Sequence, residues 1–325
     1  MKCTSKKTVL MAFCLALLLT GCGQAQFAMP YTADSEVSSF RIVNQEERSE
    51  TAQPFAAGLC VVSSNITPES VDMSNTSGAG LFDLNRHNVL YAKNVHEKLY
   101  PASLTKVMTA LVALENGSAD SVLTASANVK NLESGATMCG LNEGDQMTLD
   151  QALHLLLISS ANDAAVMIAE GVAGSTEAFA EMMNEKALSL GATNTHFVNP
   201  HGLSDEEHYT TVYDMYLIMD AALDYSLFNE IIGMDSYTTV YTDAGGAPKE
   251  ITVNNSNYYL RGEAEAPSGV TVLGGKTGTT SAAGSCLILL ARDSGSNPYI
   301  SVILHAESRD ILYTQMTDLL EEINK

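Results

Sequence analysis

Strand-like patterns occupy both ends of this chain and helical patterns fill its middle, which limits the folds open to it. Strands are expected at Ala57-Val62, Ala79-Leu84, Val89-Tyr91, Tyr237-Thr242, Val270-Leu273, Cys286-Ala291 and Tyr299-His305. A closing helix is expected from Arg309 to Ile323, where apolar residues recur at helical spacing. An antiparallel sheet built from both ends of the chain, with a helical lobe inserted, fits this order and predicts an α+β fold.

The helical middle carries clear start and stop signals. They are a capping box at Thr148-Leu149-Asp150-Gln151, a break at Ser159-Ser160, a restart at Asn162 or Asp163 toward Gly171, and a stop at Gly191 after a helix from Thr176 to Leu190. These signals predict three successive helices in the inserted lobe.

The most informative motif is Ser103-Leu104-Thr105-Lys106, at the start of a helical pattern that ends near Gly117. Side chains three residues apart share one helix face, so Ser103 and Lys106 are one turn apart. A serine at a buried helix start, followed one turn later by a lysine, has the arrangement of a nucleophile and its base. Alone, the motif is common by chance, with serine as a helix cap and lysine as a solvated charge.

Two further motifs follow in order, Ser160-Ala161-Asn162 and Lys276-Thr277-Gly278. Ser-x-x-Lys, Ser-Asp-Asn and Lys-Thr-Gly together are the signature of class A β-lactamases and penicillin-binding proteins. Each arises readily by accident, but here all three occur in this order and in fitting local patterns. Together they predict an enzyme with a serine nucleophile.

From about Ala57 onward, the chain resembles the serine-type D-alanyl-D-alanine carboxypeptidases, which are low-molecular-weight penicillin-binding proteins. The resemblance rests on the three motifs with their flanks and on four further segments: Leu141-Asn142-Glu143-Gly144-Asp145, Phe197-Val198-Asn199-Pro200-His201-Gly202-Leu203, His208-Tyr209-Thr210-Thr211 and Asn255-Ser256-Asn257-Tyr258-Tyr259-Leu260. It implies the β-lactamase/transpeptidase-like fold, an antiparallel sheet flanked by helices with an inserted helical lobe. The active site would lie between the lobes.

The resemblance implies catalytic roles for Ser103, Lys106 and Ser160. Ser103 would be the acylating nucleophile. Lys106 would be its base, which requires burial or a neighbouring cation such as Lys276 to favour the neutral amine. Ser160 would relay a proton to the departing amine, and it could also cap a helix.

Four side chains would bind the substrate. Asn162 would orient the substrate's backbone amide, with a helix N-cap as its structural alternative. Lys276 and Thr277 would bind the terminal carboxylate. Arg309 resembles, more loosely, an arginine that helps to hold this carboxylate, and a plain charge at a helix start is its alternative.

Backbone groups would complete the site. Gly278 lacks a side chain, so substrate could lie against its strand. The backbone N–H groups of Ser103 and Thr279 are the candidates for an oxyanion hole. No cofactor is expected, and no spacing of cysteine and histidine suggests zinc.

The implied reaction removes the terminal D-alanine from peptidoglycan stem peptides through a Ser103 acyl-enzyme, and β-lactams would acylate the same serine as inhibitors. A D,D-endopeptidase of peptidoglycan cross-links is the nearest alternative. A serine β-lactamase is disfavoured on two grounds. The second motif lacks its middle Asp. Class A β-lactamases activate the deacylating water with a glutamate on a loop after this motif, whereas the candidate glutamates here all lie in helical patterns: Glu170, Glu177, Glu181 and Glu185. Intact motifs also weaken the idea of a non-catalytic wall-binding lipoprotein.

The N-terminus has the features of a targeting segment. Three lysines precede an apolar run from Val9 to Leu19 that is too short to span a membrane. Leu19-Thr20-Gly21-Cys22 resembles a bacterial lipoprotein cleavage box, with an ordinary secretory signal and a stray cysteine as the alternative. The expected division is a lipoprotein signal peptide at 1–21, a flexible tether at 22–54 and a D,D-peptidase catalytic domain at 55–325, lipid-anchored through Cys22 to the outside of the cell membrane.

The chain is strongly acidic, with a formal net charge of −21 that becomes more negative once the three lysines of the signal are removed. Nucleic-acid binding is therefore not expected, because polyanions require basic patches. Anionic lipid would not attract the domain either, so membrane attachment would rest on the lipid alone.

Three cysteines remain after the signal and the lipidated thiol are set aside. They cannot all pair, so no disulfide framework is expected. Cys60 and Cys286 lie in apolar runs typical of core residues, whereas Cys139, beside Gly140, could be exposed in a loop.

Overall fold

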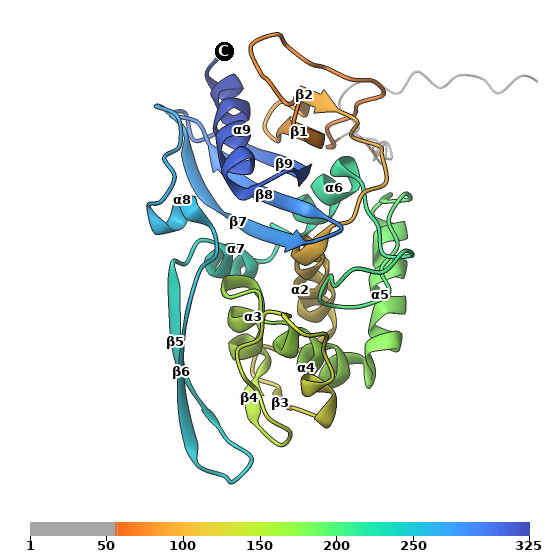
Figure 1. Cartoon of the computed structure of the whole chain (residues 1–325), viewed down its shortest axis with the longest axis vertical. Coiled ribbons are helices and arrows are strands. Elements are labelled where there is room, and N and C mark those ends of the chain that lie inside the picture. The colour runs from red at the N-terminus through yellow and green to blue at the C-terminus, as the bar shows by residue number, and fades with distance from the viewer. Residues whose placement is uncertain (1–55, 57) are drawn as a thin grey trace, which may run out of the picture. The chain divides into compact units, whose positions relative to one another are not determined.

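The first and last parts of the chain meet in one five-stranded antiparallel sheet (Figure 1). The computed structural model describes residues 56 and 58–325. The strand order is β2-β1-β9-β8-β7, with β1 at Thr76–Asp83, β2 at Asn88–Lys93, β7 at Thr271–Thr280, β8 at Gly284–Arg292 and β9 at Pro298–Ala306. β1 pairs directly with β9, for example at Gly80 opposite Val302. The predicted sheet, built from both ends of the chain, is confirmed.

Helices cover both faces of this sheet. Successive side chains of a strand point to opposite faces. In β8, Leu287 and Leu289 share a core with Met316 of α9 (Arg309–Glu321), whereas Ile288 belongs to the core of the helical lobe. Full burial of one such side chain contributes about 1.5–3 kcal/mol, so both layers hold the sheet in place.

The helical lobe is built around α2. Its helices are α2 at Thr105–Asn116, α3 at Leu149–Ile158, α4 at Asn162–Ala173, α5 at Thr176–Ser189, α6 at Val212–Ala222 and α7 at Ser226–Ile232. α2 packs against α3, α4, α5 and α6, and all residues from Thr105 to Ala113 are buried. Polar side chains inside such a helix need hydrogen-bond partners. The buried Lys106 amine must therefore find its partners within the protein.

Short helical turns join these elements. They are η1 at Ala102–Leu104, which leads directly into α2, η2 at Ala127–Lys130, α8 at Tyr258–Arg261 and η3 at Glu322–Asn324. The closing helix predicted from Arg309 to Ile323 is thus α9 followed by η3.

The predicted starts of the three middle helices are confirmed, whereas α4 ends two residues later than expected. Thr148 caps α3 through its side chain, and Gln151 returns the bond to the Thr148 backbone, so the capping box is complete. α3 ends just before Ser159-Ser160. α4 continues past Gly171 to Ala173. It is capped by Gly174, which has a left-handed backbone with φ +83°.

A second antiparallel sheet was predicted only at one strand. Its order is β3-β4-β5-β6, with β3 at Val122–Thr124, β4 at Gln146–Thr148, β5 at Ser236–Thr242 and β6 at Pro248–Asn254. β3 and β4 have three residues each, too few for a periodic pattern. β5 and β6 form a long hairpin that projects from the rest of the folded part (Figure 1).

The strand predicted at Ala57-Val62 is wrong for its described residues. The Cys60 N–H donates to the Tyr216 hydroxyl, and the Cys60 carbonyl accepts from the Tyr213 hydroxyl. Side chains of α6 therefore satisfy backbone groups that a strand would have paired. In contrast, the strand predicted at Val270-Leu273 is longer than expected and continues as β7 through the third motif.

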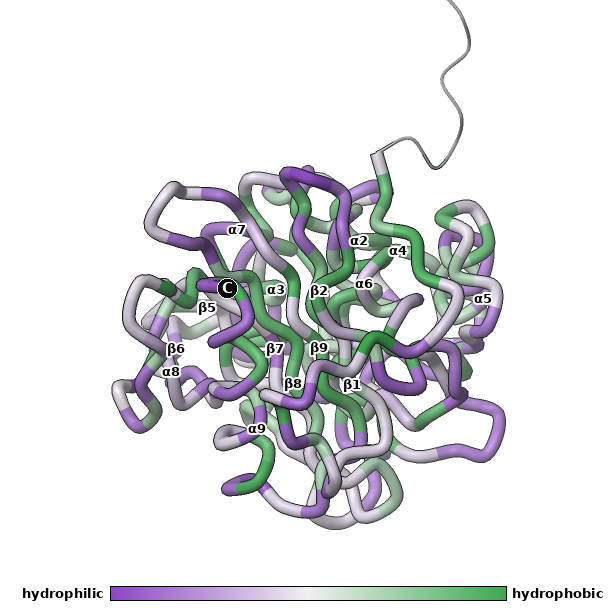
Figure 2. The backbone as a smooth tube through the Cα atoms, turned by 90° about the horizontal axis from the view of Figure 1, so that it is seen from above, coloured by the Kyte–Doolittle hydropathy of each residue, from purple (hydrophilic) through white to green (hydrophobic). Residues whose placement is uncertain are grey.

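Hydropathy follows this architecture. In Figure 2, apolar segments run along the central strands and hydrophilic segments gather in the peripheral loops. Within the described residues, no helix is both long and apolar enough to cross a membrane. The predicted signal peptide, the tether up to residue 54 and Cys22 lie outside those residues.

Candidate active site

Lys106 is the centre of the site. Ser103 lies in η1 and Lys106 in the first turn of α2, so their side chains share one face as predicted. The Lys106 amine lies 2.9 Å from Ser103 Oγ, 2.6 Å from Asn162 Oδ1 and 2.6 Å from the His201 carbonyl oxygen. The first two motifs are therefore in direct contact.

The three partners of Lys106 suit a neutral amine. A neutral amine has two N–H groups and one lone pair. The Asn162 and His201 oxygens accept hydrogen bonds, so they use the two N–H groups and leave the lone pair for the Ser103 hydroxyl proton. This arrangement allows Lys106 to take the proton of Ser103.

Electrostatics favour the same protonation state. Lys106 is fully buried, and burial together with the charge of Lys276 holds its pKa well below the ordinary lysine value, while Asp163 acts in the opposite direction. Burial also lowers the pKa of Lys276 to about 7. The expectation that burial and a neighbouring cation would act on Lys106 agrees with this environment.

Lys276 and Thr277 lie on β7, the edge strand of the main sheet. The Lys276 amine donates to the Thr277 carbonyl at 2.8 Å. The Thr277 hydroxyl lies 2.5 Å from the Ser256 hydroxyl. The third motif is thus held from the segment just before α8.

The second motif occupies the break between α3 and α4. Ser160 is buried in a left-handed conformation, φ +62°, and no hydrogen bond of its side chain is found in the described part of the chain. Ala161 is the N-cap of α4 and has no side-chain capping bond. Neither Ser160 nor Asn162 therefore caps this helix, because Asn162 Oδ1 serves Lys106 instead.

Asp163 is a site residue that sequence reasoning missed. Its fully buried carboxylate accepts N–H groups from Cys139, Gly140 and Leu141, at 2.8–3.0 Å. It thereby fixes the preceding loop against the start of α4. The available signal was an acidic residue at the start of an otherwise apolar helix, directly after Asn162.

Gly278 lies directly against the segment that carries Ser103. A Cβ added there would lie 2.9 Å from the Ser103 nitrogen, 3.0 Å from Ala102 Cβ and 3.1 Å from the Pro101 carbonyl oxygen. The missing side chain therefore makes room for the serine segment, and the expected contact of Gly278 with substrate stays a prediction. The missing side chain also sets β7 directly against η1.

Arg309 is not joined to the third motif. Its Nη1 donates to the Tyr258 hydroxyl at 3.4 Å, and its guanidinium lies 5.6 Å from the centre of the Tyr258 ring. No hydrogen bond or ion pair of the described residues links Arg309 to Lys276 or Thr277.

The cysteines and glutamates have structural surroundings. Cys60 and Cys286 are buried, as predicted, and Cys139 is half-buried beside Asp163 rather than exposed. Glu170 accepts from Asn128 at 2.6 Å, and no described hydrogen bond joins a candidate glutamate to Ser103 or Lys106. Among the described residues, no group of three or more His, Cys, Asp or Glu is placed to hold a metal ion.

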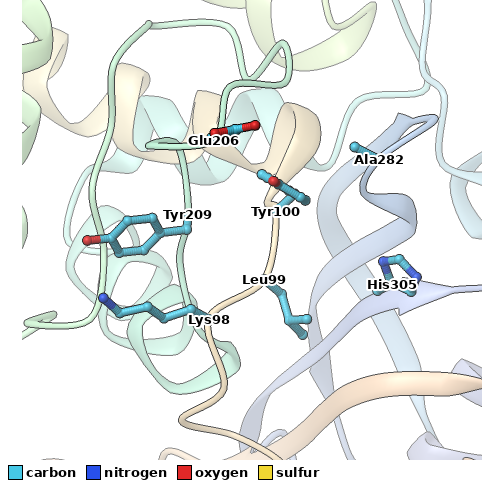
Figure 3. Close-up of a pocket in the computed structure, with 7 residues that line it drawn as sticks. All are labelled: Lys98, Leu99, Tyr100, Glu206, Tyr209, Ala282 and His305. Carbon is cyan, nitrogen blue, oxygen red and sulfur yellow. The ribbon is translucent and has the colours of Figure 1, made fainter.

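A cavity of about 380 Å³ lies along residues 98–100, which lead toward the serine motif (Figure 3). Its lining consists of Lys98, Leu99, Tyr100, Glu206, Tyr209, Ala282 and His305. It lies between the segment that leads into Ser103 and the turn that follows β7. None of the three motifs lines this cavity.

The family model described as D-alanyl-D-alanine carboxypeptidase matches residues 62–308. The chain is 36% identical to D-alanyl-D-alanine carboxypeptidase DacF of Bacillus subtilis over 75% of this chain and 60% of that protein. It is 30% identical to a D-alanyl-D-alanine endopeptidase of Pseudomonas aeruginosa over 74% of each. The chain spans about 60% of the length of the first two carboxypeptidase relatives that it matches.

Solved structures share the fold. A DD-transpeptidase from Streptomyces superposes with a TM-score of 0.72 at 27% identity, covering 80% of this chain and 99% of that one. A D-alanyl-D-alanine carboxypeptidase from Mycobacterium tuberculosis gives 0.68 at 27% identity, covering 79% and 92%. These likenesses confirm the predicted β-lactamase/transpeptidase-like fold. With all three motifs inside the matched residues, the chain belongs to the D-alanyl-D-alanine carboxypeptidase family.

Proposed function

We propose that this protein is a serine D,D-carboxypeptidase that removes the terminal D-alanine from peptidoglycan stem peptides. The observation that carries the proposal is the buried Lys106 amine, hydrogen-bonded to Ser103 Oγ, Asn162 Oδ1 and the His201 carbonyl. Family membership and the relatives named carboxypeptidases support the same reaction.

Acylation begins when neutral Lys106 takes the Ser103 proton. The Ser103 oxygen attacks the carbonyl of the penultimate D-alanine, and the backbone N–H groups of Ser103 and Thr279 stabilise the developing oxyanion. Ser160 relays to the departing amine the proton that Lys106 took from Ser103, and the peptide bond breaks. The terminal D-alanine leaves, and water then hydrolyses the Ser103 ester.

The polar side chains of the second and third motifs orient the substrate. Lys276 and Thr277 bind the terminal carboxylate, and Asn162 orients a substrate amide. A bound carboxylate favours the charged form of Lys276, which burial alone disfavours. Arg309, held by Tyr258, stays a prediction for this carboxylate. β-Lactams acylate Ser103 because their lactam carbonyl resembles the scissile amide.

Incubation with a purified pentapeptide stem, followed by mass spectrometry, tests the reaction. Loss of one alanine, abolished in Ser103→Ala, is the expected result. The second candidate is a D,D-endopeptidase, favoured by the relative of that name. Cleavage of a cross-linked muropeptide dimer with no loss of alanine from the pentapeptide would establish this alternative and refute the carboxypeptidase.

We further propose that the mature protein is a lipoprotein outside the cytoplasm. Residues 1–21 are its signal peptide, 22–54 a tether and 55–325 the catalytic domain. The support is the Leu19-Thr20-Gly21-Cys22 box after a short apolar run. The strongly acidic chain has no net charge that would attract it to anionic lipid, so the acyl chains on Cys22 would provide the attachment.

A further inference from the structure

The residue before the nucleophile has an unusual backbone. Ala102 is buried and has φ +48°, in the left-handed region. For a residue other than glycine this conformation is strained. It persists only where surrounding contacts hold it, so Ala102 must be held by specific neighbours.

The Ala102–Ser103 peptide links this conformation to catalysis. A peptide unit is planar and almost always trans, so its C=O and N–H point in opposite directions. The Ala102 carbonyl and the Ser103 N–H belong to the same unit. A group that fixes the direction of the Ala102 oxygen therefore fixes the direction of the N–H proposed for the oxyanion hole.

A hydrogen-bonded chain holds the Ala102 oxygen. The Val198 N–H lies 3.1 Å from His208 Nδ1, which must accept because a backbone N–H only donates. Neutral His208 then carries its proton on Nε2 and donates to Thr105 Oγ1 at 2.8 Å. Thr105 in turn donates to the Ala102 carbonyl at 2.8 Å. Each bond in this chain has one possible direction.

The surroundings of His208 keep the ring neutral. The residue is 1% exposed, and its ring meets Phe197 edge-on. The groups that face it are Asp205, whose charge would favour protonation, and His196 and Lys106, which oppose it. Desolvation is the largest influence and, together with His196 and Lys106, outweighs Asp205 and lowers the pKa of His208 to about 4. The bond from Val198 is therefore kept at neutral pH.

Close backbone packing completes the support. A Cβ at Gly202 would lie 1.9 Å from the Ala102 oxygen, and one at Gly278 would lie 3.0 Å from Ala102 Cβ. Gly202 follows His201, whose carbonyl accepts from Lys106. The same loop thus supports both the peptide before Ser103 and the proposed base.

We propose that Thr105 and His208 are positioning residues for the oxyanion hole. Their hydrogen bonds hold the Ala102 carbonyl so that the Ser103 N–H points at the oxygen that becomes negative during acylation. This inference rests on the proposed acylation of Ser103. Neither residue contacts the reacting atoms, and both act through the Ala102–Ser103 peptide.

Thr105→Val and Thr105→Ser form a matched pair for the test. Valine keeps the shape but loses the hydroxyl, whereas serine keeps the hydroxyl. Acylation by penicillin at saturating concentration should fall about 10- to 100-fold in Thr105→Val. The half-saturating concentration should change little, and Thr105→Ser should acylate at nearly the wild-type rate.

Infrared spectroscopy of the acyl-enzyme provides a readout that a merely structural role would not move. Hydrogen bonds in an oxyanion hole polarise the ester carbonyl and lower its stretching frequency. The frequency should therefore rise in Thr105→Val and stay low in Thr105→Ser. Unchanged acylation, or slow acylation with an unchanged frequency, would overturn the inference.

Variants of His208 keep the test decisive if Thr105→Val does not fold. His208→Gln retains an N–H donor for Thr105, and His208→Leu has none, so the leucine variant should lose more acylation and show the higher frequency. Equal behaviour of the two folded variants would contradict the relay. Because penicillin is the probe, a wild-type protein that is acylated but leaves the pentapeptide intact would refute the proposed function alone.

Discussion

A buried lysine needs partners for its polar atoms, and Lys106 has three of them. Two are oxygens that only accept, and the third is the Ser103 hydroxyl, which can give up a proton. At the residue scale, these partners together with desolvation favour the neutral amine that the proposed base requires.

Removal of the Lys106 amine should slow acylation strongly without loss of Ser103. A general base contributes about 100- to 10,000-fold, so Lys106→Ala should acylate with penicillin more slowly by that factor. Lys276→Ala is the control, and it should mainly raise the concentration of substrate needed for half-maximal rate. Stopped-flow acylation checks both variants, and an undiminished rate in Lys106→Ala would place the base elsewhere.

His208 should make stability depend on pH. Its pKa is lowered to about 4 when folded, from 6.5 in the unfolded chain, so between these values the unfolded state binds more protons. Its contribution is complete above pH 6.5 and is lost as the pH falls toward 4, by about 1.4 kcal/mol per pH unit. Urea unfolding at pH 7, 6 and 5 should show a shallower loss for His208→Gln than for the wild type, and parallel losses would contradict this.

At the element scale, the break between α3 and α4 carries the second motif. Asp163 fixes the loop at 139–141 to the start of α4, and a capping box fixes the start of α3. Neither Asp163 nor the capping box belongs to the proposed catalytic groups. They nevertheless determine where the chain turns, and so where Asn162 meets Lys106.

Asp163→Asn should destabilise this junction and alter the base. An amide N–H₂ cannot accept from the loop N–H groups, so one buried side would be unpaired, at a cost of about 1–3 kcal/mol. The Asp163 charge raises the pKa of Lys106, so its removal should shift the acidic limb of the acylation–pH profile to lower pH. Urea unfolding and acylation from pH 5 to 9 measure the two effects. An acidic limb that moves to higher pH would show that the Asp163 charge does not raise the pKa of Lys106.

At the scale of the whole molecule, one edge strand and one buried helix meet to form the site. β7 presents the third motif, η1 and α2 present the first, and Gly278 allows them to touch. In the sheet that carries β7, strands β1 and β2 come from the other end of the folded chain. The site therefore depends on the pairing of both ends.

Attachment to the membrane should depend on Cys22. The acidic chain provides no polybasic second signal, so the lipid must suffice, which favours more than one acyl chain. Cys22→Ser should release the protein from the membrane fraction of its native host, and the intact mass of the N-terminal peptide should show the lipid in the wild type. An unmodified N-terminus at or beyond Cys22 would refute the lipoprotein while leaving the catalytic proposal untouched.

The sequence alone determined the motifs, the order of strands and helices, and the starts of α3, α4 and α5. These features are encoded locally, by periodicity and by capping residues within a few positions. Even the sheet from both ends of the chain followed from element order. The two three-residue strands did not, because they are too short for a pattern.

Only the tertiary structure decided which atoms meet. Lys106 and the His201 carbonyl are 95 residues apart, and Thr105 and His208 are 103 apart. No sequence signal near Ala102 predicts its left-handed backbone. Thr105, Gly202 and Gly278 surround this residue in the folded structure. Gly278 was singled out from the sequence, but only the tertiary structure shows that it lies against Ala102 and Ser103. Contacts between distant segments arise from packing, and no local pattern specifies them.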